Sequence, residues 1–242
     1  MTPFRWTNCY ADVQASKHDM TIRSYFEDVI VPAIATLEEK ISALGRSHSP
    51  GDVFAQADME DVLREAKLAF GLSVQSIWER QFRAYLRGCA KELRPDEPLE
   101  NRVARADWKD LQKHFRDLRG IGLDNFPSYQ TLDTLQHLGN ACRHGDGASA
   151  IELSKRCPDF WSPVPPMPTE MHLPGPEVAP SVAMMDIPVE SLQEFVEAIA
   201  EFWRDAEYIY NESIERKHPS LVAKLARERE QRHWLPQATT TK

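Results

Sequence analysis

Apolar residues recur at three- and four-residue steps along most of the chain, which is the spacing of amphipathic α-helices. The pattern predicts helices over residues 21–44, 59–93, 107–118, 128–144, 149–156 and 186–217, and a last segment over 221–234. No stretch alternates between apolar and polar residues over a useful length, so no β-strand is expected. The sequence therefore predicts an all-α protein.

Residues that favour helix ends flank several of these segments. Asp58 and Ser128 are expected to act as N-caps, while Gly45 and Gly120 are expected to stop helices. Pro32 should kink the first helix, because proline cannot donate a backbone hydrogen bond. The side chains expected to point inward from that helix are those of Phe26, Val29, Ile34, Leu37, Ile41 and Leu44.

Composition divides the chain into parts. Residues 1–18 show no clear period and are expected to form an arm, residues 19–218 a helical domain, and residues 219–242 a basic segment. Residues 158–188 hold nine of the 17 prolines, which excludes a regular helix there. We expect a long irregular strap over the helical bundle, anchored by Phe160, Trp161, Met167, Met171, Met184 and Met185.

Charge and cysteine usage limit the classes of partner and cofactor. A formal net charge of −8 and a pI near 5.5 argue against a surface coated with nucleic acid, although a local basic site is allowed. The four cysteines, Cys9, Cys89, Cys142 and Cys157, form no CxxC pair, so no metal and no cofactor are expected. Without an apolar run of about 18 residues, we expect no membrane association and a cytoplasmic location.

Residues 138–147, Leu-Gly-Asn-Ala-Cys-Arg-His-Gly-Asp-Gly, carry the strongest indication of chemistry. An apolar stripe predicts a helix here that ends before Gly145. Asn140 and His144 lie four residues apart on one face, and Arg143 lies four residues after Gly139 on the next. Cations are also common in the last turn of a helix, because its dipole favours them, so capping alone is an alternative explanation.

The pattern Asn140-x-x-x-His144-Gly145 at the end of a helix resembles the HEPN superfamily. The resemblance covers this motif and the helical context of residues 58–216. In that family an Arg directly precedes the Asn, whereas this chain has Gly139. Arg143 could substitute for it, because helical side chains lean toward the N-terminus and Gly139 should leave that space open.

The resemblance implies a HEPN-like helical bundle and a metal-independent endoribonuclease of the toxin or phage-defence kind. In such an enzyme His144 would be the general base on the ribose 2′-hydroxyl, Arg143 would hold the scissile phosphate and Asn140 would orient one of them. It also implies a homodimer, and a neutralising or defence-system protein is a further expected partner. The alternatives are a non-catalytic module that binds a nucleotide or a partner, and a purely structural helical adaptor.

Two further charged features have more than one interpretation. Arg80, Arg83 and Arg87 follow one another at helical spacing and could contact RNA, or they could form a solvated face on which Glu79 pairs with Arg83. In the C-terminal segment basic residues outnumber Glu228 and Glu230, which suits RNA, an acidic partner or docking on the protein's own acidic surface. These basic residues are Lys224, Arg227, Arg229 and Arg232, together with Arg216 and Lys217 just before the segment.

Overall fold

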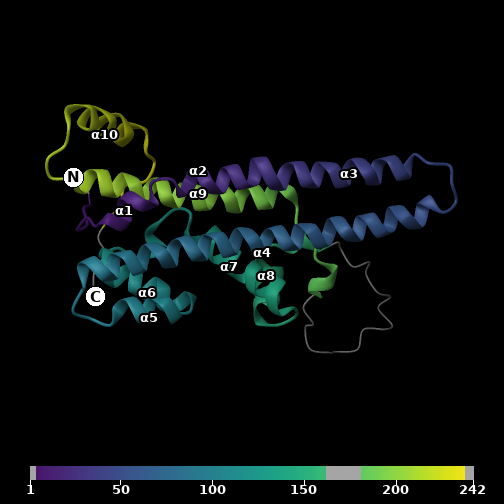
Figure 1. Ribbon diagram of the computed structural model, residues 1–242, viewed down its shortest axis with the longest axis horizontal. Helices are drawn as coiled ribbons and strands as arrows, with labels where there is room; N and C mark the ends of the chain where they lie inside the picture. The colour runs from purple at the N-terminus through teal and green to yellow at the C-terminus, as the bar shows by residue number, and fades with distance from the viewer. Residues whose placement is uncertain (1–3, 162–180, 238–242) are drawn as a thin grey trace. The chain divides into compact units, whose positions relative to one another are not determined.

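The computed structural model describes residues 4–161 and 181–237, and all regular elements in these ranges are helical (Figure 1). The predicted all-α class is confirmed. The α-helices are α1 (Tyr10–Ala15), α2 (His18–Tyr25), α3 (Val31–Gly45), α4 (Asp52–Leu93), α5 (Leu99–Arg105), α6 (Trp108–Arg119), α7 (Tyr129–His144), α8 (Ala148–Arg156), α9 (Val189–Ser213) and α10 (Pro219–Gln231). Single turns are η1 (Phe26–Ile30, a π-helix), η2 (Leu123–Asn125), η3 (Pro158–Phe160) and η5 (Val182–Met184).

The chain packs as two compact units made of interleaved segments. The first unit comprises Met1–Arg23, Ile77–Leu132 and Val196–Lys242, and the second comprises Ser24–Ser76 and Asp133–Phe195. Helices α2, α4, α7 and α9 contribute residues to both units. The division predicted from composition, with boundaries at residues 18 and 218, uses continuous stretches of sequence. It stays a prediction.

Aromatic rings fill the core of the first unit. Trp78 and Phe82 of α4 stack with their ring centroids 5.0 Å apart, and Phe202 of α9 meets Trp78 edge to face at 5.0 Å. Phe126, which follows η2, lies 5.0 Å from Phe202 and 5.1 Å from Trp234. Aromatic pairs of this geometry stabilise a core beyond their buried area. They hold the C-terminal segment against the same core as the middle of the chain.

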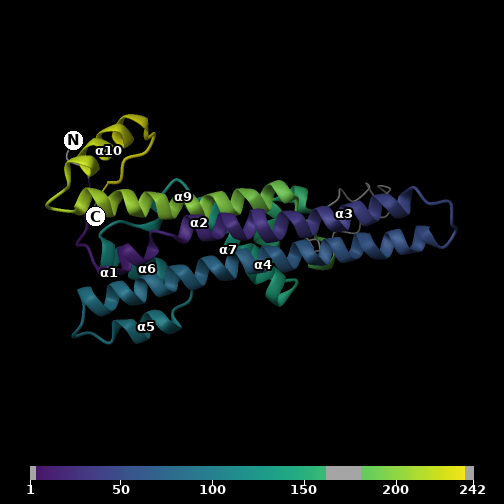
Figure 2. The same ribbon diagram turned by 45° about the horizontal axis from the view of Figure 1, so that its top comes forward.

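The second unit contains α3 and the first half of α4, which run side by side in both views (Figures 1 and 2). The irregularity expected at Pro32 takes the form of the π-helical turn η1, directly before α3. That turn buries Phe26 and Ile30, and Ile34 continues the buried row, whereas Val29 is 47% exposed. The predicted inward position of Val29 is therefore wrong, because the π turn shifts the apolar stripe.

Helix ends agree only in part with their sequence signals. Gly120 ends α6 with φ +70°, and the carboxylate of Asp107 accepts a hydrogen bond from the Asp110 N–H at its start. Helix α7 begins after Ser128 as expected, but the Ser128 hydroxyl is buried without a hydrogen-bond partner in the structure, so it is not the predicted cap. Helix α9 ends at Ser213 rather than Lys217, whose ammonium donates to the carbonyls of Glu212 and Ile214.

Three helical stretches lie outside the predicted segments. Helix α4 begins at Asp52 and passes through Asp58, which is therefore no N-cap. Helix α1 lies within the expected arm, and α5 follows two prolines that were expected only to end α4. Both α1 and α5 are about two turns long or less, which is too short for apolar periodicity to identify them.

The two described ends of the strap are anchored in the second unit. The indole N–H of Trp161 donates to the Ser181 carbonyl at 2.9 Å, and the Asp186 N–H donates to the Phe160 carbonyl at 2.7 Å. Phe160, Trp161 and Met185 are buried, as expected, whereas Met184 is 67% exposed, so its predicted anchoring is wrong. The expectations for Met167 and Met171 lie outside the described residues.

Candidate functional site at the end of α7

The motif predicted from the sequence occupies the last turns of α7, in the second unit. Leu135, Leu138 and Ala141 are fully buried and fix one face of the helix. Gly145 ends it with φ +73°, a conformation that favours glycine, and its N–H donates to the Ala141 carbonyl at 2.8 Å. The helix therefore ends at His144, directly before Gly145, as the sequence predicts.

The turn after α7 is tied to the described end of the strap. The Asp146 carboxylate accepts hydrogen bonds from the Val182 N–H at 2.7 Å and from the Ser181 hydroxyl at 3.1 Å. No local pattern predicts this contact, because the Pro-rich segment separates the two partners along the chain. It fixes the backbone on which the motif ends.

The three proposed catalytic side chains lie at the surface of α7. Asn140 is half-buried, and Arg143 and His144 are exposed. Within the described residues, the side chains of Asn140 and His144 make no hydrogen bond or ion pair with protein groups. Their polar atoms are therefore accessible to a ligand.

Arg143 leans back along α7 toward Gly139, as its predicted role requires. Its Nη2 donates to the Oε1 of Gln75 at 3.2 Å, and Gln75 lies on α4 within the same unit. A Cβ built at Gly139 would lie only 2.4 Å from Cγ of Gln75 and 2.8 Å from Oε1. Arg143 and Gly139 thus share one neighbour, the side chain of Gln75.

The space beside Gly139 is filled rather than open, so that part of the sequence prediction is wrong. Gln75 is fully buried, and its Nε2 donates to Oε1 of Gln136 at 3.0 Å. This bond turns Oε1 of Gln75 toward Arg143. Arg143 therefore rests on an amide next to Gly139 instead of lying in a vacant groove.

Helix α7 carries a second imidazole, that of His137, which was not predicted as part of the site. His137 lies three residues before Asn140 and seven before His144, which places the three on one helix face. Its Nε2 lies 3.9 Å from Oδ2 of Asp133, a carboxylate that also accepts a hydrogen bond from Arg156 of α8 at 2.8 Å. The spacing from His144 is the signal that could have found it.

The stripe Arg80, Arg83 and Arg87 lies on the part of α4 that belongs to the first unit. The Arg83 guanidinium donates to the carbonyls of Val103 and Ala106, both at 2.8 Å, and to Glu79, which confirms the predicted Glu79–Arg83 pair. The Arg87 guanidinium pairs with Glu100 at 2.8 Å, and Arg80 is exposed. Two of the three cations therefore hold α5, and contact of the stripe with RNA stays a prediction.

The basic C-terminal segment docks within its own unit, which was one of the predicted alternatives. Arg229 makes two hydrogen bonds to the Glu212 carboxylate, at 2.7 and 2.8 Å. Arg232 pairs with Asp205, and its guanidinium carbon lies 4.1 Å from the centre of the Tyr208 ring. These cations are therefore engaged by acidic and aromatic groups of α9.

Neither metal sites nor membrane spans are found in the described ranges. Among residues 4–161 and 181–237, no three His, Cys, Asp or Glu side chains are grouped so that they could hold a metal ion. None of the helices in these ranges combines the length and the apolar character needed to span a bilayer.

No protein-family model, curated protein or solved structure matches the chain. The likeness to the HEPN superfamily therefore rests on the motif of α7 and on its helical surroundings.

Proposed function

We propose that the exposed end of α7 is the active site of a metal-independent, HEPN-like endoribonuclease of the toxin or phage-defence kind. The observation that carries the proposal is the direction of Arg143, which reaches back to an amide beside Gly139. A guanidinium is thereby held next to the position at which the family's Arg begins. With His144 one residue further on, a phosphate-binding cation and a general base stand together.

In this mechanism His144 removes the proton of the ribose 2′-hydroxyl, and the oxygen attacks the adjacent phosphorus. The bond to the 5′-oxygen breaks, a 2′,3′-cyclic phosphate forms, and the leaving oxygen takes a proton from solvent at this exposed site. Arg143 neutralises the charge that develops on the phosphoryl oxygens. Asn140, half-buried on the face of His144, orients the imidazole or the substrate.

Arg143 keeps enough donors for this role while it contacts Gln75. A guanidinium has five N–H donors, and the bond to Gln75 occupies one of them. The other four donors remain for a phosphate, so the bond to Gln75 need not be broken. RNA would bind locally, because the whole chain carries a net charge of −8. A homodimer and a neutralising or defence-system protein partner belong to the same proposal.

The second candidate is a module that binds a nucleotide or a partner protein without cleaving RNA. The replacement of the family's Arg by Gly139 favours it, and so does the buried Gln75 that fills the space of the missing side chain. In that case the same exposed groups would bind a phosphate or a carboxylate without turnover.

Substitutions at the end of α7 distinguish catalysis from helix capping. His144→Ala should abolish RNA cleavage, yet it should cost only about 0.3–1 kcal/mol of stability, the value of a charge near a helix C-terminus. Arg143→Ala should also abolish cleavage, and Arg143→Lys should rescue it poorly, because lysine cannot make a bidentate phosphate contact. His48→Ala, at another exposed histidine of the same unit, is the matched control and should keep full activity.

Two results would contradict these assignments. If Arg143→Ala keeps full activity, Arg143 does not replace the missing Arg. If His144→Ala unfolds the protein, His144 is structural. Cleavage and stability are measured on the same samples, so the two effects remain separable.

A further inference from the structure

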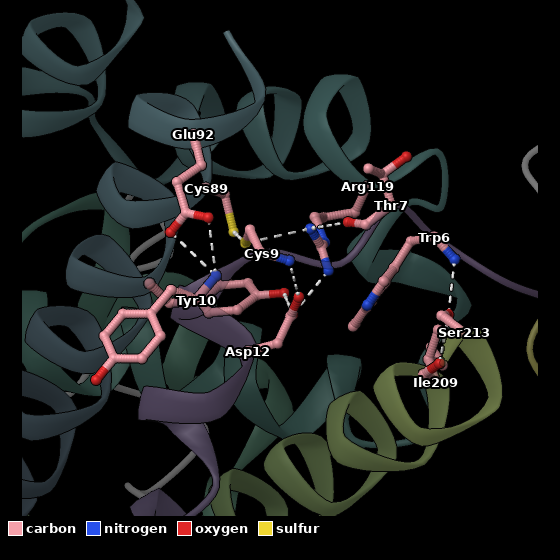
Figure 3. A network of polar contacts seen from close by, with 11 residues as sticks. Trp6, Thr7, Cys9, Tyr10, Asp12, Cys89, Glu92, Arg119, Ile209 and Ser213 are labelled. Atoms are coloured by element: carbon pink, nitrogen blue, oxygen red, sulfur yellow. Dashed lines mark hydrogen bonds and ion pairs between the residues drawn. The ribbon is translucent and has the colours of Figure 1, made fainter. Parts of the chain in front are cut away.

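A buried polar network anchors the N-terminal segment within the first unit (Figure 3). The Asp12 carboxylate of α1 accepts hydrogen bonds from Arg119 at 2.7 Å, from the Tyr85 hydroxyl at 2.9 Å and from the Cys9 N–H at 2.9 Å. The side chains of Arg119 and Asp12 are 0% and 1% exposed. This network fixes the residue that precedes α1, which is Cys9.

Cys9 faces a second thiol. The two side chains point toward each other in Figure 3, and their Sγ atoms are 3.5 Å apart. Both cysteines are free. The Arg119 guanidinium donates to Sγ of Cys9 at 3.8 Å. A pair of thiols at this distance needs a small approach to reach the bonding distance of a disulfide, about 2.05 Å.

The backbones that carry the two thiols also approach closely. A Cβ built at Gly88, the neighbour of Cys89, would lie 2.8 Å from Cβ of Ala11. A side chain at position 88 would therefore hold the N-terminal segment away from α4. The absence of one permits the short Cα–Cα separation that a disulfide requires, about 4.4–6.8 Å.

We propose that Cys9 and Cys89 form a peroxide-reactive thiol pair, in which Cys9 reacts first and Cys89 then closes a reversible disulfide. The sulfur of Cys9, as thiolate, attacks one oxygen of hydrogen peroxide, the O–O bond breaks, and the leaving hydroxide becomes water with the proton that Cys9 gave up. Cys9 is then a sulfenic acid. Cys89 loses its proton and attacks the sulfur of Cys9, the S–O bond breaks, and a second water leaves.

One molecule of hydrogen peroxide is enough to oxidise the pair of thiols. The two sulfurs lose two electrons in total, and one hydrogen peroxide takes them up to give two waters. A dithiol reductant reverses the change by thiol–disulfide exchange. Apart from the peroxide and the reductant, the reaction needs no group that the protein lacks.

The surroundings assign the order of reaction. Both thiols are buried, Cys9 at 7% exposed and Cys89 at 0%, so a molecule as small as hydrogen peroxide reaches Cys9 more readily. The contact with Cys89 and the charge of Arg119 lower the pKa of Cys9, against the opposing effects of burial and of Asp12. The contact with Cys9 and burial raise the pKa of Cys89. A sensor thiol of lowered pKa beside a resolving thiol is the arrangement on which such oxidation depends.

The other two cysteines provide an internal comparison in the second unit. Burial raises the pKa of Cys142 to about 12, and burial also raises the pKa of Cys157. Neither is paired with a second sulfur among the described residues. Both should therefore stay reduced at peroxide concentrations that oxidise Cys9.

The test uses the full-length, reduced protein, treated with hydrogen peroxide in the presence of a chelator. After catalase treatment, the protein is unfolded and alkylated, and its intact mass and peptides are measured without a reductant. We expect two of the four thiols to escape alkylation and a single cross-linked peptide pair that contains Cys9 and Cys89. A dithiol should restore all four.

Variants make the outcome specific. Cys89→Ser should allow dimedone to trap a sulfenic acid at Cys9, and the double variant Cys142→Ser/Cys157→Ser should still form the disulfide. Oxidation should lower the unfolding equilibrium constant by roughly 10²–10³-fold, because the bond closes a loop of about 80 residues. The proposal is overturned if all four thiols remain alkylatable while glutathione in the same tube is oxidised, or if Cys142 or Cys157 is oxidised first.

Discussion

Gly139 offers a direct test of the geometry on which the candidate site depends. Replacing it with alanine adds one methyl group, whose carbon would lie 2.4 Å from Cγ and 2.7 Å from Cδ of Gln75. These atoms belong to a fully buried side chain that is bonded to Gln136 and Arg143. Gln75 must therefore move if position 139 carries a side chain.

The expected loss follows from three contributions. Overpacking costs about 1–3 kcal/mol, and displacing the bond between Gln75 and Gln136 adds about 0.5–1.5 kcal/mol. Against this, alanine is favoured over glycine inside a helix by about 1 kcal/mol. Gly139→Ala should therefore lower the free energy of unfolding by roughly 0.5–3.5 kcal/mol.

Without the Gln75 side chain, Gly139→Ala should stabilise the protein instead of destabilising it. In a Gln75→Ala background the methyl group meets no Gln75 side chain beyond Cβ, so Gly139→Ala should raise stability by up to about 1 kcal/mol. Urea unfolding of the four proteins, followed by far-UV circular dichroism, gives the coupling energy between the two positions. Gly45→Ala is the control, since its Cβ would meet only the tip of the Gln56 side chain, at 3.2 Å.

A coupling energy below about 0.5 kcal/mol, the usual error of additivity, would refute this reasoning. So would a gain in stability from Gly139→Ala in both backgrounds. Either result would mean that Gln75 does not fill the space beside Gly139. The structural support for Arg143 as the substitute cation would then be lost.

Three further predictions concern other parts of the molecule. Asp12→Asn should cost roughly 3–5 kcal/mol in urea unfolding, because it leaves the buried Arg119 charge unpaired, whereas Glu197→Gln in an exposed ion pair should cost less than about 1 kcal/mol. The rate at which iodoacetamide alkylates Cys142 should keep rising with pH up to about pH 12, because burial raises the pKa of this thiol to about 12 and only the thiolate reacts. A rate that levels off near pH 9, the ordinary pKa of a thiol, would contradict this. Arg83→Met should speed amide hydrogen exchange in α5 at least about tenfold, because its charged bonds to two carbonyls are lost, and unchanged exchange would refute the role of Arg83 as an anchor.

Local sequence patterns predicted the helix that carries the candidate site and the residue at which it ends. The stop at Gly145 and the apolar face of α7 follow from residues within a few positions of each other, which is the range in which spacing and end signals act. The same holds for Gly120 at the end of α6. The fold class and the exposure of His144 could therefore be anticipated.

The contacts that define the candidate site could not be predicted from the sequence. Gln75 meets Arg143 across 68 residues of sequence, and no local pattern marks an amide that fills the space beside a glycine. Arg83 has the spacing of a solvated stripe, yet its partners are carbonyl oxygens at the end of α5. Every residue has a backbone carbonyl, so the sequence cannot indicate which carbonyls a cation such as Arg83 will bind.

The buried network in the first unit was missed for a related reason. Asp12, Cys9 and Arg119 come from an arm without periodicity and from a helix more than a hundred residues later. Charged residues are almost never fully buried unless they are paired, so no local pattern marks Arg119 as a buried residue. Pairing across that distance is a property of the fold.

Cleavage of RNA in the presence of a chelator tests the central claim most directly. The purified protein is incubated with a mixed single-stranded RNA in EDTA, beside His144→Ala and His48→Ala, and the ends of the products are identified. The proposed mechanism predicts 2′,3′-cyclic phosphate ends from the unaltered protein and from His48→Ala, and none from His144→Ala. Cleavage that depends on a divalent metal, or intact RNA with a folded protein, would contradict it.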